Sequence, residues 1–67
     1  MNKIIHAQDE VYEKEQTLKK IKVDAVNWVT YYLDEDTNEK WIQEYPFPEM
    51  QAGGPKQLRL LEKFPWE

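Results

Sequence analysis

The first third of the chain predicts a single helix. Residues 8–21 contain neither glycine nor proline, and most of them are good helix formers. Acidic residues gather in the first half of this segment and lysines in the second, as the helix dipole favours, and Asp9 is suited to the N-cap. The apolar positions fall near one stripe, which comprises Ile4, Ala7, Val11, Leu18 and Ile21. Because the stripe is thin, the helix must be stabilised by packing.

The following segment, residues 23–33, predicts a strand with two apolar faces. It is rich in β-branched and aromatic residues, which favour strands. One face of this strand would hold Val23, Ala25, Val29, Tyr31 and Leu33, and the other Val26, Trp28, Thr30 and Tyr32. We therefore expect it to be covered on both sides, or covered on one side and free to bind on the other.

Two more strands are expected after a polar turn. Residues 34–39 predict the turn, and residues 40–45 a shorter strand that completes an antiparallel hairpin. Pro46 and Pro48 end that strand because proline has no N–H to donate.

The remainder of the chain begins with a loop. Gly53 and Gly54 in this loop would adopt backbone conformations that other residues resist. Residues 57–62 predict a third strand or a short helix. The strand is favoured, with Leu58, Leu60 and Phe64 on one face. The expected architecture is α+β: one domain, residues 1–67, with an N-terminal helix packed on an antiparallel sheet of about three strands.

Composition narrows the function. Nine of the 67 residues are aromatic, which argues against a disordered chain. No apolar stretch approaches the ~18 residues of a membrane span, and because no basic-then-apolar pattern opens the chain we expect no signal peptide. The absence of cysteine excludes disulfides and thiolate metal sites and fits the cytoplasm. With no serine either, a Ser or Cys nucleophile is excluded.

Charge is concentrated in the middle of the chain. Residues 1–22 carry five lysines and four acids (+1), residues 23–52 one lysine and seven acids (−6), and residues 53–67 three bases and two acids (+1). An acidic surface repels nucleic-acid phosphates and attracts basic partners. We expect no direct contact with nucleic acid and none with a membrane.

The sequence contains no complete catalytic or metal-binding motif. His6 stands alone near the N-terminus and is expected on the surface. Asp34, Asp36 and Asn38 match positions one, three and five of a calcium loop, but Glu39 replaces its glycine and Tyr45 its bidentate glutamate. We therefore expect no catalytic residue, no cofactor and no metal.

The aromatic residues of the acidic segment are either core or partner contacts. Trp and Tyr are over-represented at binding hot spots, and both roles can coexist if the two strand faces divide them. The candidate partner-binding residues are Trp28, Tyr32, Asp34, Glu35, Asp36, Glu39, Glu44 and Glu49.

Three ordered runs carry a family resemblance. They are Trp28-x-Thr30-x-Tyr32-x-Asp34, then Trp41-x-x-x-Tyr45-Pro46, then Glu49-Met50-x-x-Gly53-Gly54-Pro55-x-x-Leu58. Over residues 18–60 the chain resembles bacterial immunity protein family twenty-seven of the polymorphic toxin systems. It departs from the family pattern where Gln51-Ala52 replace the start of a His-Gly-Gly-Gly-Pro-like run.

The resemblance implies a function as well as an α+β fold. Such proteins are encoded beside a toxin and protect the producing cell by binding it. The chain would then bind and neutralise a cognate toxin, such as a basic nuclease, through its acidic, aromatic-rich surface. The alternative is a small interaction or regulatory module, an adaptor or a phage-encoded protein, with a different protein partner. The neighbouring gene would distinguish the two.

Overall fold

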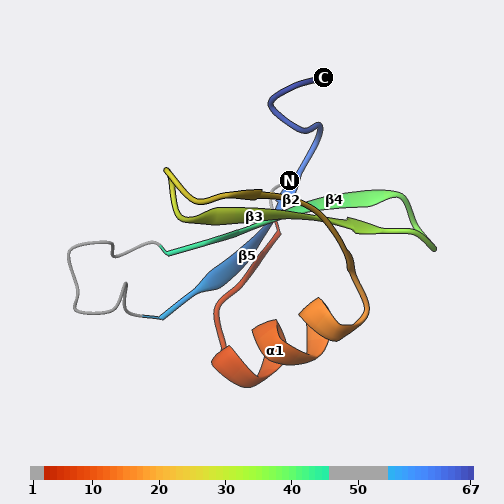
Figure 1. The fold of residues 1–67 in the computed structure, drawn as a ribbon. Helices are drawn as coiled ribbons and strands as arrows, with labels where there is room; N and C mark the ends of the chain where they lie inside the picture. Colours follow the sequence, from red (N-terminus) through yellow and green to blue (C-terminus); the bar gives the residue numbers. More distant parts are fainter. Residues whose placement is uncertain (1–2, 46–54) are drawn as a thin grey trace.

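The computed structural model describes residues 3–45 and 55–67 and has an α+β fold (Figure 1). In chain order the elements are β1 (Ile4–Ile5), α1 (Gln8–Gln16), β2 (Lys19–Asp24), β3 (Val29–Asp34), β4 (Glu39–Glu44) and β5 (Gln57–Leu61). The described strands form one antiparallel sheet in the order β1-β5-β4-β3-β2. The predicted combination of one helix and an antiparallel sheet is confirmed. The expected number of about three strands is an underestimate, because the described residues alone form five.

The helix begins at Gln8, as the sequence predicts, but ends at Gln16, five residues earlier than expected. Ala7 is the N-cap residue: its backbone is extended, and no side-chain hydrogen bond caps the helix there. Asp9 therefore lies in the first turn, where its carboxylate accepts the Glu10 N–H at 3.0 Å. At the other end the Thr17 N–H and hydroxyl both donate to the Lys14 carbonyl, at 3.0 and 2.8 Å. The Lys14 carbonyl is satisfied locally by these bonds, and the chain leaves the helix there.

Two strands that the sequence did not predict, β1 and β2, flank the helix. Ile4 and Ile5 pair with Arg59 and Leu58 as β1, so Ile4 belongs to the sheet and not to a helical stripe. β2 contains the last residues of the predicted helix and the first of the predicted strand, and Ile21 in its middle is exposed. β2 lies at the edge of the sheet opposite β1.

A four-residue turn divides the single strand expected over residues 23–33. The side chain of Asp24 accepts the N–H groups of Val26 and Asn27, each at 3.2 Å, and closes the turn. Because the turn interrupts the alternation, Val23 pairs with Thr30 and shares its face. Val23 therefore lies on the opposite face from Tyr31, and the predicted grouping of the two is wrong.

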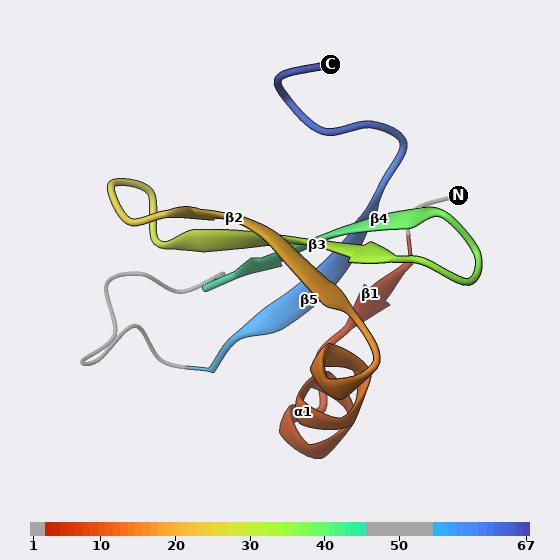
Figure 2. The same ribbon diagram turned by 45° about the vertical axis from the view of Figure 1, so that its right-hand side comes forward.

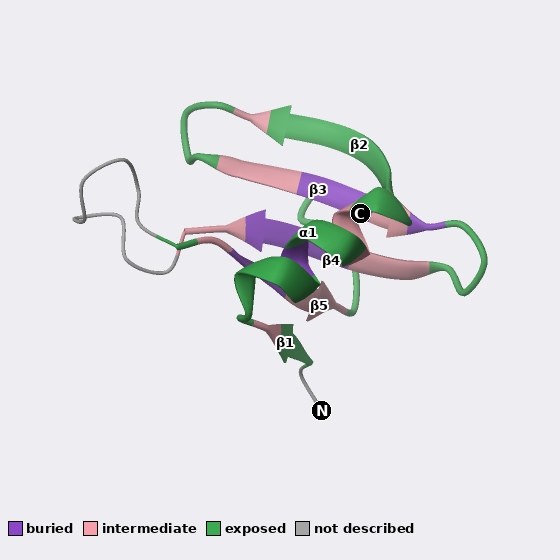
Figure 3. Ribbon diagram, turned by 90° about the horizontal axis from the view of Figure 1, so that it is seen from below, coloured by how far each residue is buried: buried purple, intermediate pink, exposed green. Residues whose placement is uncertain are grey.

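The helix covers one face of the sheet, and the C-terminal segment lies on the other (Figures 1 and 2). The helix-side core consists of Val11, Tyr32, Trp41 and Leu58, with Ile5, Leu18 and Leu60 packed against it. Burial is greatest in the inner strands, as Figure 3 shows. Three of these side chains are fully buried: Val11, Trp41 and Leu58.

The opposite face has a smaller core of Tyr31, Ile42 and Phe64. Phe64 lies beyond the end of β5 and stacks on Trp66 with their ring centroids 4.7 Å apart, and both rings meet Tyr31 edge-on. The Glu67 carboxylate accepts the Phe64 N–H at 2.6 Å and pairs with the Lys40 ammonium at 2.6 Å, which holds the segment down. The expected common face of Leu58, Leu60 and Phe64 is therefore wrong, because strand alternation ends before Phe64.

Replacing Trp41 tests the helix-side core. We expect Trp41→Ala to lower the free energy of unfolding by about 3–5 kcal/mol, because a fully buried indole leaves a cavity. Urea unfolding followed by circular dichroism measures this loss. Tyr12→Ala is the control: its side chain is 63% exposed, and we expect a change within about 0.5 kcal/mol. Unchanged stability together with weakened partner binding would place Trp41 in an interface instead.

Candidate protein-binding surface

Asp34 organises the turn between β3 and β4. Its Oδ1 accepts the N–H groups of Asp36 and Thr37 at 3.0 and 3.4 Å, and its carbonyl accepts the Asn38 N–H at 2.7 Å. Asn38 has a φ of 65°, a left-handed conformation that asparagine tolerates better than most residues. The turn is therefore held in one shape by local hydrogen bonds.

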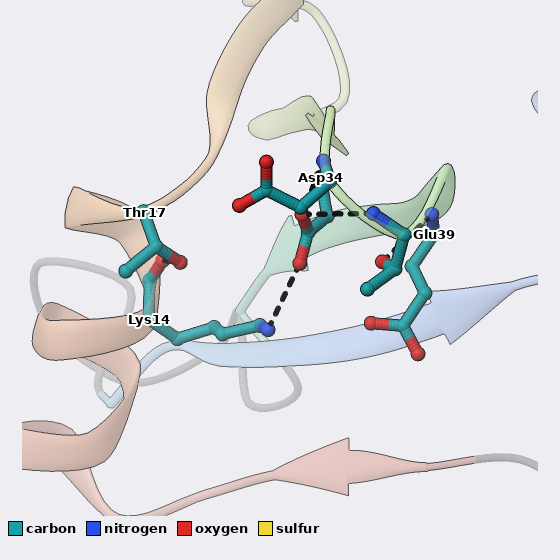
Figure 4. Close-up of polar contacts among 6 residues, drawn as sticks. Lys14, Thr17, Asp34 and Glu39 are labelled. Atoms are coloured by element: carbon teal, nitrogen blue, oxygen red, sulfur yellow. Dashed lines mark hydrogen bonds and ion pairs between the residues drawn. The ribbon is translucent and has the colours of Figure 1, made fainter.

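The Asp34 carboxylate faces the helix (Figure 4). Its Oδ2 pairs with the Lys14 ammonium at 3.5 Å, and the residue is only 8% exposed. Burial alone would raise the pKa of Asp34, but the hydrogen bonds from Asp36, Thr37 and Lys14 outweigh it and lower that pKa below its ordinary value. Asp34 therefore fixes the shape of the turn, but its own exposed area is too small to contribute much contact with a partner.

The exposed acids of this region follow Asp34. Glu35 and Asp36 project from the turn, and Glu39 at the start of β4 is half-buried. Glu35 approaches Lys19 at 3.9 Å, but both side chains are more than 60% exposed, so the pair is weak. We call Glu35, Asp36 and Glu39 the acidic turn.

The structure separates two other candidates from the acidic turn. Tyr32 belongs to the helix-side core, where burial raises the pKa of its hydroxyl. Glu44 lies at the other end of β4, where the Arg59 guanidinium donates to its two oxygens at 2.8 and 3.1 Å. The hydrogen bond from Arg59 lowers the pKa of Glu44, and Gln57 donates a further bond at 2.8 Å. Glu49 lies outside the described residues.

Trp28 is exposed at the far end of β3 from the acidic turn. Its side chain is 61% exposed and meets Tyr45 edge-on, with ring centroids 6.3 Å apart. The six residues of β3 separate the two regions by about 17–20 Å at ~3.4 Å per residue. The eight candidates therefore do not form one patch: the acidic turn and Trp28 mark opposite ends of the sheet.

The candidate partner-binding residues did not include two exposed apolar residues near Trp28. Val26 and Val23 are 88% and 56% exposed, because the chain reverses between β2 and β3. The signal was the Asp24–Asn27 pair, since Asp and Asn side chains stabilise turns by bonding to nearby backbone. The turn was not predicted because the residues before and after it favour strands, so that residues 23–33 together predict one continuous strand.

The structure locates the candidate metal ligands and the single histidine. The described residues contain no group of three or more metal-ligating side chains, and His6 is exposed. Across residues 3–45 and 55–67, no helix is long and apolar enough to cross a membrane.

Comparison with known families identifies the chain. The described fold and surface define a small α+β protein with an acidic turn at one end of its sheet and an exposed tryptophan at the other. The family model for immunity protein 27 matches residues 11–62, more than half of the chain, so the chain belongs to the immunity protein 27 family. The resemblance found over residues 18–60 is confirmed. No curated protein and no solved structure matches the chain.

Acid unfolding tests the Lys14–Asp34 pair. The folded-state pKa of Asp34 is lowered, so its stabilising effect is complete above the unfolded pKa of ~3.9 and is lost as pH falls through the folded pKa. We expect Asp34→Asn, which keeps a side-chain oxygen for the turn, to be less stable than the parent at pH 7.

The difference in stability should close as the pH falls from about 5 to about 2. Urea unfolding at several pH values measures it, with Glu35→Gln as the exposed control whose stability stays near that of the parent throughout. A difference for Asp34→Asn that is as large at low pH as at pH 7 would show that the charge of Asp34 contributes nothing.

Proposed function

We propose that this protein binds a cognate bacterial toxin in the cytoplasm of the producing cell and neutralises it without catalysis. Membership of the immunity protein 27 family carries the proposal. The structure supports a binding role, since its described residues present exposed charged and aromatic side chains on a rigid sheet. Binding alone accounts for protection, because a toxin held in a complex is removed from its target.

We further propose that the acidic turn meets a basic surface of the toxin. Residues 23–52 carry the whole acidic excess, with one lysine against seven acids. Of these acids, Asp34 and Glu44 are paired with Lys14 and Arg59, whereas Glu35 and Asp36 are exposed. Such a turn would attract a basic toxin, for example a nuclease whose own site must attract phosphate.

Co-expression tests the function. The neighbouring toxin gene is expressed from an inducible promoter, with and without this chain, and cell growth is followed. We expect growth only when the chain is present, together with a complex of the two purified proteins in solution. Continued toxicity despite folded, abundant protein would reject neutralisation and favour an interaction module with another partner.

Charge reversal tests the acidic turn. We expect the double variant Glu35→Lys, Asp36→Lys to slow association with the toxin roughly tenfold at low salt, because exposed charges steer encounter. Its salt dependence should flatten, while its melting temperature and dissociation rate should change little. Stopped-flow mixing at two or more ionic strengths measures this.

The matched control is Glu10→Lys, Glu13→Lys. It makes the same change in net charge at exposed positions of α1. An equal slowing by both double variants would mean that total charge matters and the location of the acidic turn does not.

A further inference from the structure

A hollow of about 270 Å³ opens beside the turn that joins β2 to β3. Its walls include two aromatic residues, one acid and two polar residues, which belong to β2, β3 and β4 or to the chain directly beside these strands. The lining residues used here are Val23, Asp24, Trp28, Thr30, Gln43 and Tyr45. None of these belongs to the acidic turn, so the hollow is a separate feature of the surface.

The two aromatic rings stand nearly perpendicular to each other. The ring centroids of Trp28 and Tyr45 lie 6.3 Å apart with an interplanar angle of 79°. The faces of aromatic rings carry partial negative charge and attract a cation held within about 6 Å of the ring centre. Because both residues line the hollow, a cationic group that enters it can lie against an aromatic ring.

Asp24 adds a full negative charge to this wall. Its Oδ1 accepts the backbone N–H groups of Val26 and Asn27, and its Oδ2 accepts the Asn27 side-chain amide at 2.8 Å. Among the described residues, no lysine or arginine forms an ion pair with Asp24. The nearby Lys22 places its ammonium over the Trp66 ring, at 5.1 Å. The charge of Asp24 is thus fixed in position by neutral donors and forms no salt bridge within the described part of the chain; the hydrogen bonds from Asn27, with a smaller attraction from Lys22, lower the pKa of Asp24.

The backbone of Trp28 is in a conformation that is unfavourable for tryptophan. Its φ of 59° lies in the left-handed region, which is a strained conformation for a bulky residue and an easy one for glycine or asparagine. Core packing does not account for a tryptophan here, because the side chain is 61% exposed. Strained residues of this kind cluster at functional sites, where the surrounding structure holds them in place.

We propose that this hollow receives a lysine or arginine side chain of the protein partner. The aliphatic stem would lie against Val23 and the Trp28 ring, and the cationic head would meet the aromatic faces and the Asp24 carboxylate. Charge selects this occupant over an acidic one, which Asp24 would repel. The proposal rests on the proposed function, since it identifies one side chain by which a basic toxin is held.

A small model cation tests the hollow without any toxin. The probe is N-acetyl-arginine amide, titrated into the ¹⁵N-labelled protein, with N-acetyl-citrulline amide as its neutral counterpart of nearly the same shape. We expect saturable shifts of the Trp28 indole N–H and of the Thr30 and Tyr45 amides with the arginine amide. The citrulline amide should bind about two- to fivefold more weakly, the ratio that exposed cation–π contacts provide.

Two variants locate the contact. Asp24→Asn keeps an oxygen for the N–H groups of Val26 and Asn27 but loses the charge, and we expect about two- to fivefold weaker binding of the arginine amide. Trp28→Asn removes the ring at a position whose backbone asparagine tolerates, and should abolish the shifts at Thr30 and Tyr45. Glu62→Gln, which loses the same charge at an exposed position, should bind like the parent.

Three results would overturn the proposal: no saturable shift at these residues, equal binding of the two amides, or equal weakening by Asp24→Asn and Glu62→Gln. Because the titration uses this protein alone, its outcome is independent of toxin neutralisation. Arginine binding without growth protection would reject the proposed function, whereas the finding that the hollow binds a cation would stand. Growth protection without arginine binding would reject the proposal for the hollow and support the proposed function.

Discussion

The whole fold depends on burying Trp41 in the central strand. β4 lies in the middle of the sheet, and its neighbouring residues Trp41 and Ile42 are buried on opposite faces. A strand with apolar side chains on both faces must be shielded from water on both faces. Here the nine-residue helix shields one face and the C-terminal segment shields the other. The helix contributes one fully buried side chain, Val11, so most of its attachment must come from elsewhere.

Polar contacts at the two ends of the helix supply that attachment. Near its start, the Gln8 side chain donates to the Lys56 carbonyl and accepts the Lys56 N–H, at 2.7 and 3.2 Å. Near its end, Lys14 reaches Asp34 and lies 5.3 Å from the centre of the Trp41 ring. The residue that closes the β3–β4 turn therefore also anchors the helix. The shape of the acidic turn and the position of the helix depend on the same carboxylate.

Sequence reasoning succeeded where the pattern was local and failed where two signals overlapped. The turn after Asp34 and the strands β4 and β5 were predicted within a residue or two, because charged and apolar runs alternate clearly there. β2 was missed because its lysines suit a helix as well as an edge strand, where charge discourages unwanted pairing. Of the candidate surface, the exposed acids could be predicted. The burial of Asp34 and Tyr32 could not, because it depends on where the helix packs.

Under the proposed function, the separation of the acidic turn from Trp28 would give the two regions different physical roles. Exposed charges act over a distance set by the Debye length, about 8 Å in physiological salt, and so guide approach without fixing a contact. An aromatic ring acts only on contact and prolongs the life of a complex once formed. β3 connects the two regions through a hydrogen-bonded sheet, so their spacing cannot adjust to the partner. A toxin that uses both must present basic groups at a matching spacing, and a rigid spacing selects among basic proteins in a way that net charge cannot.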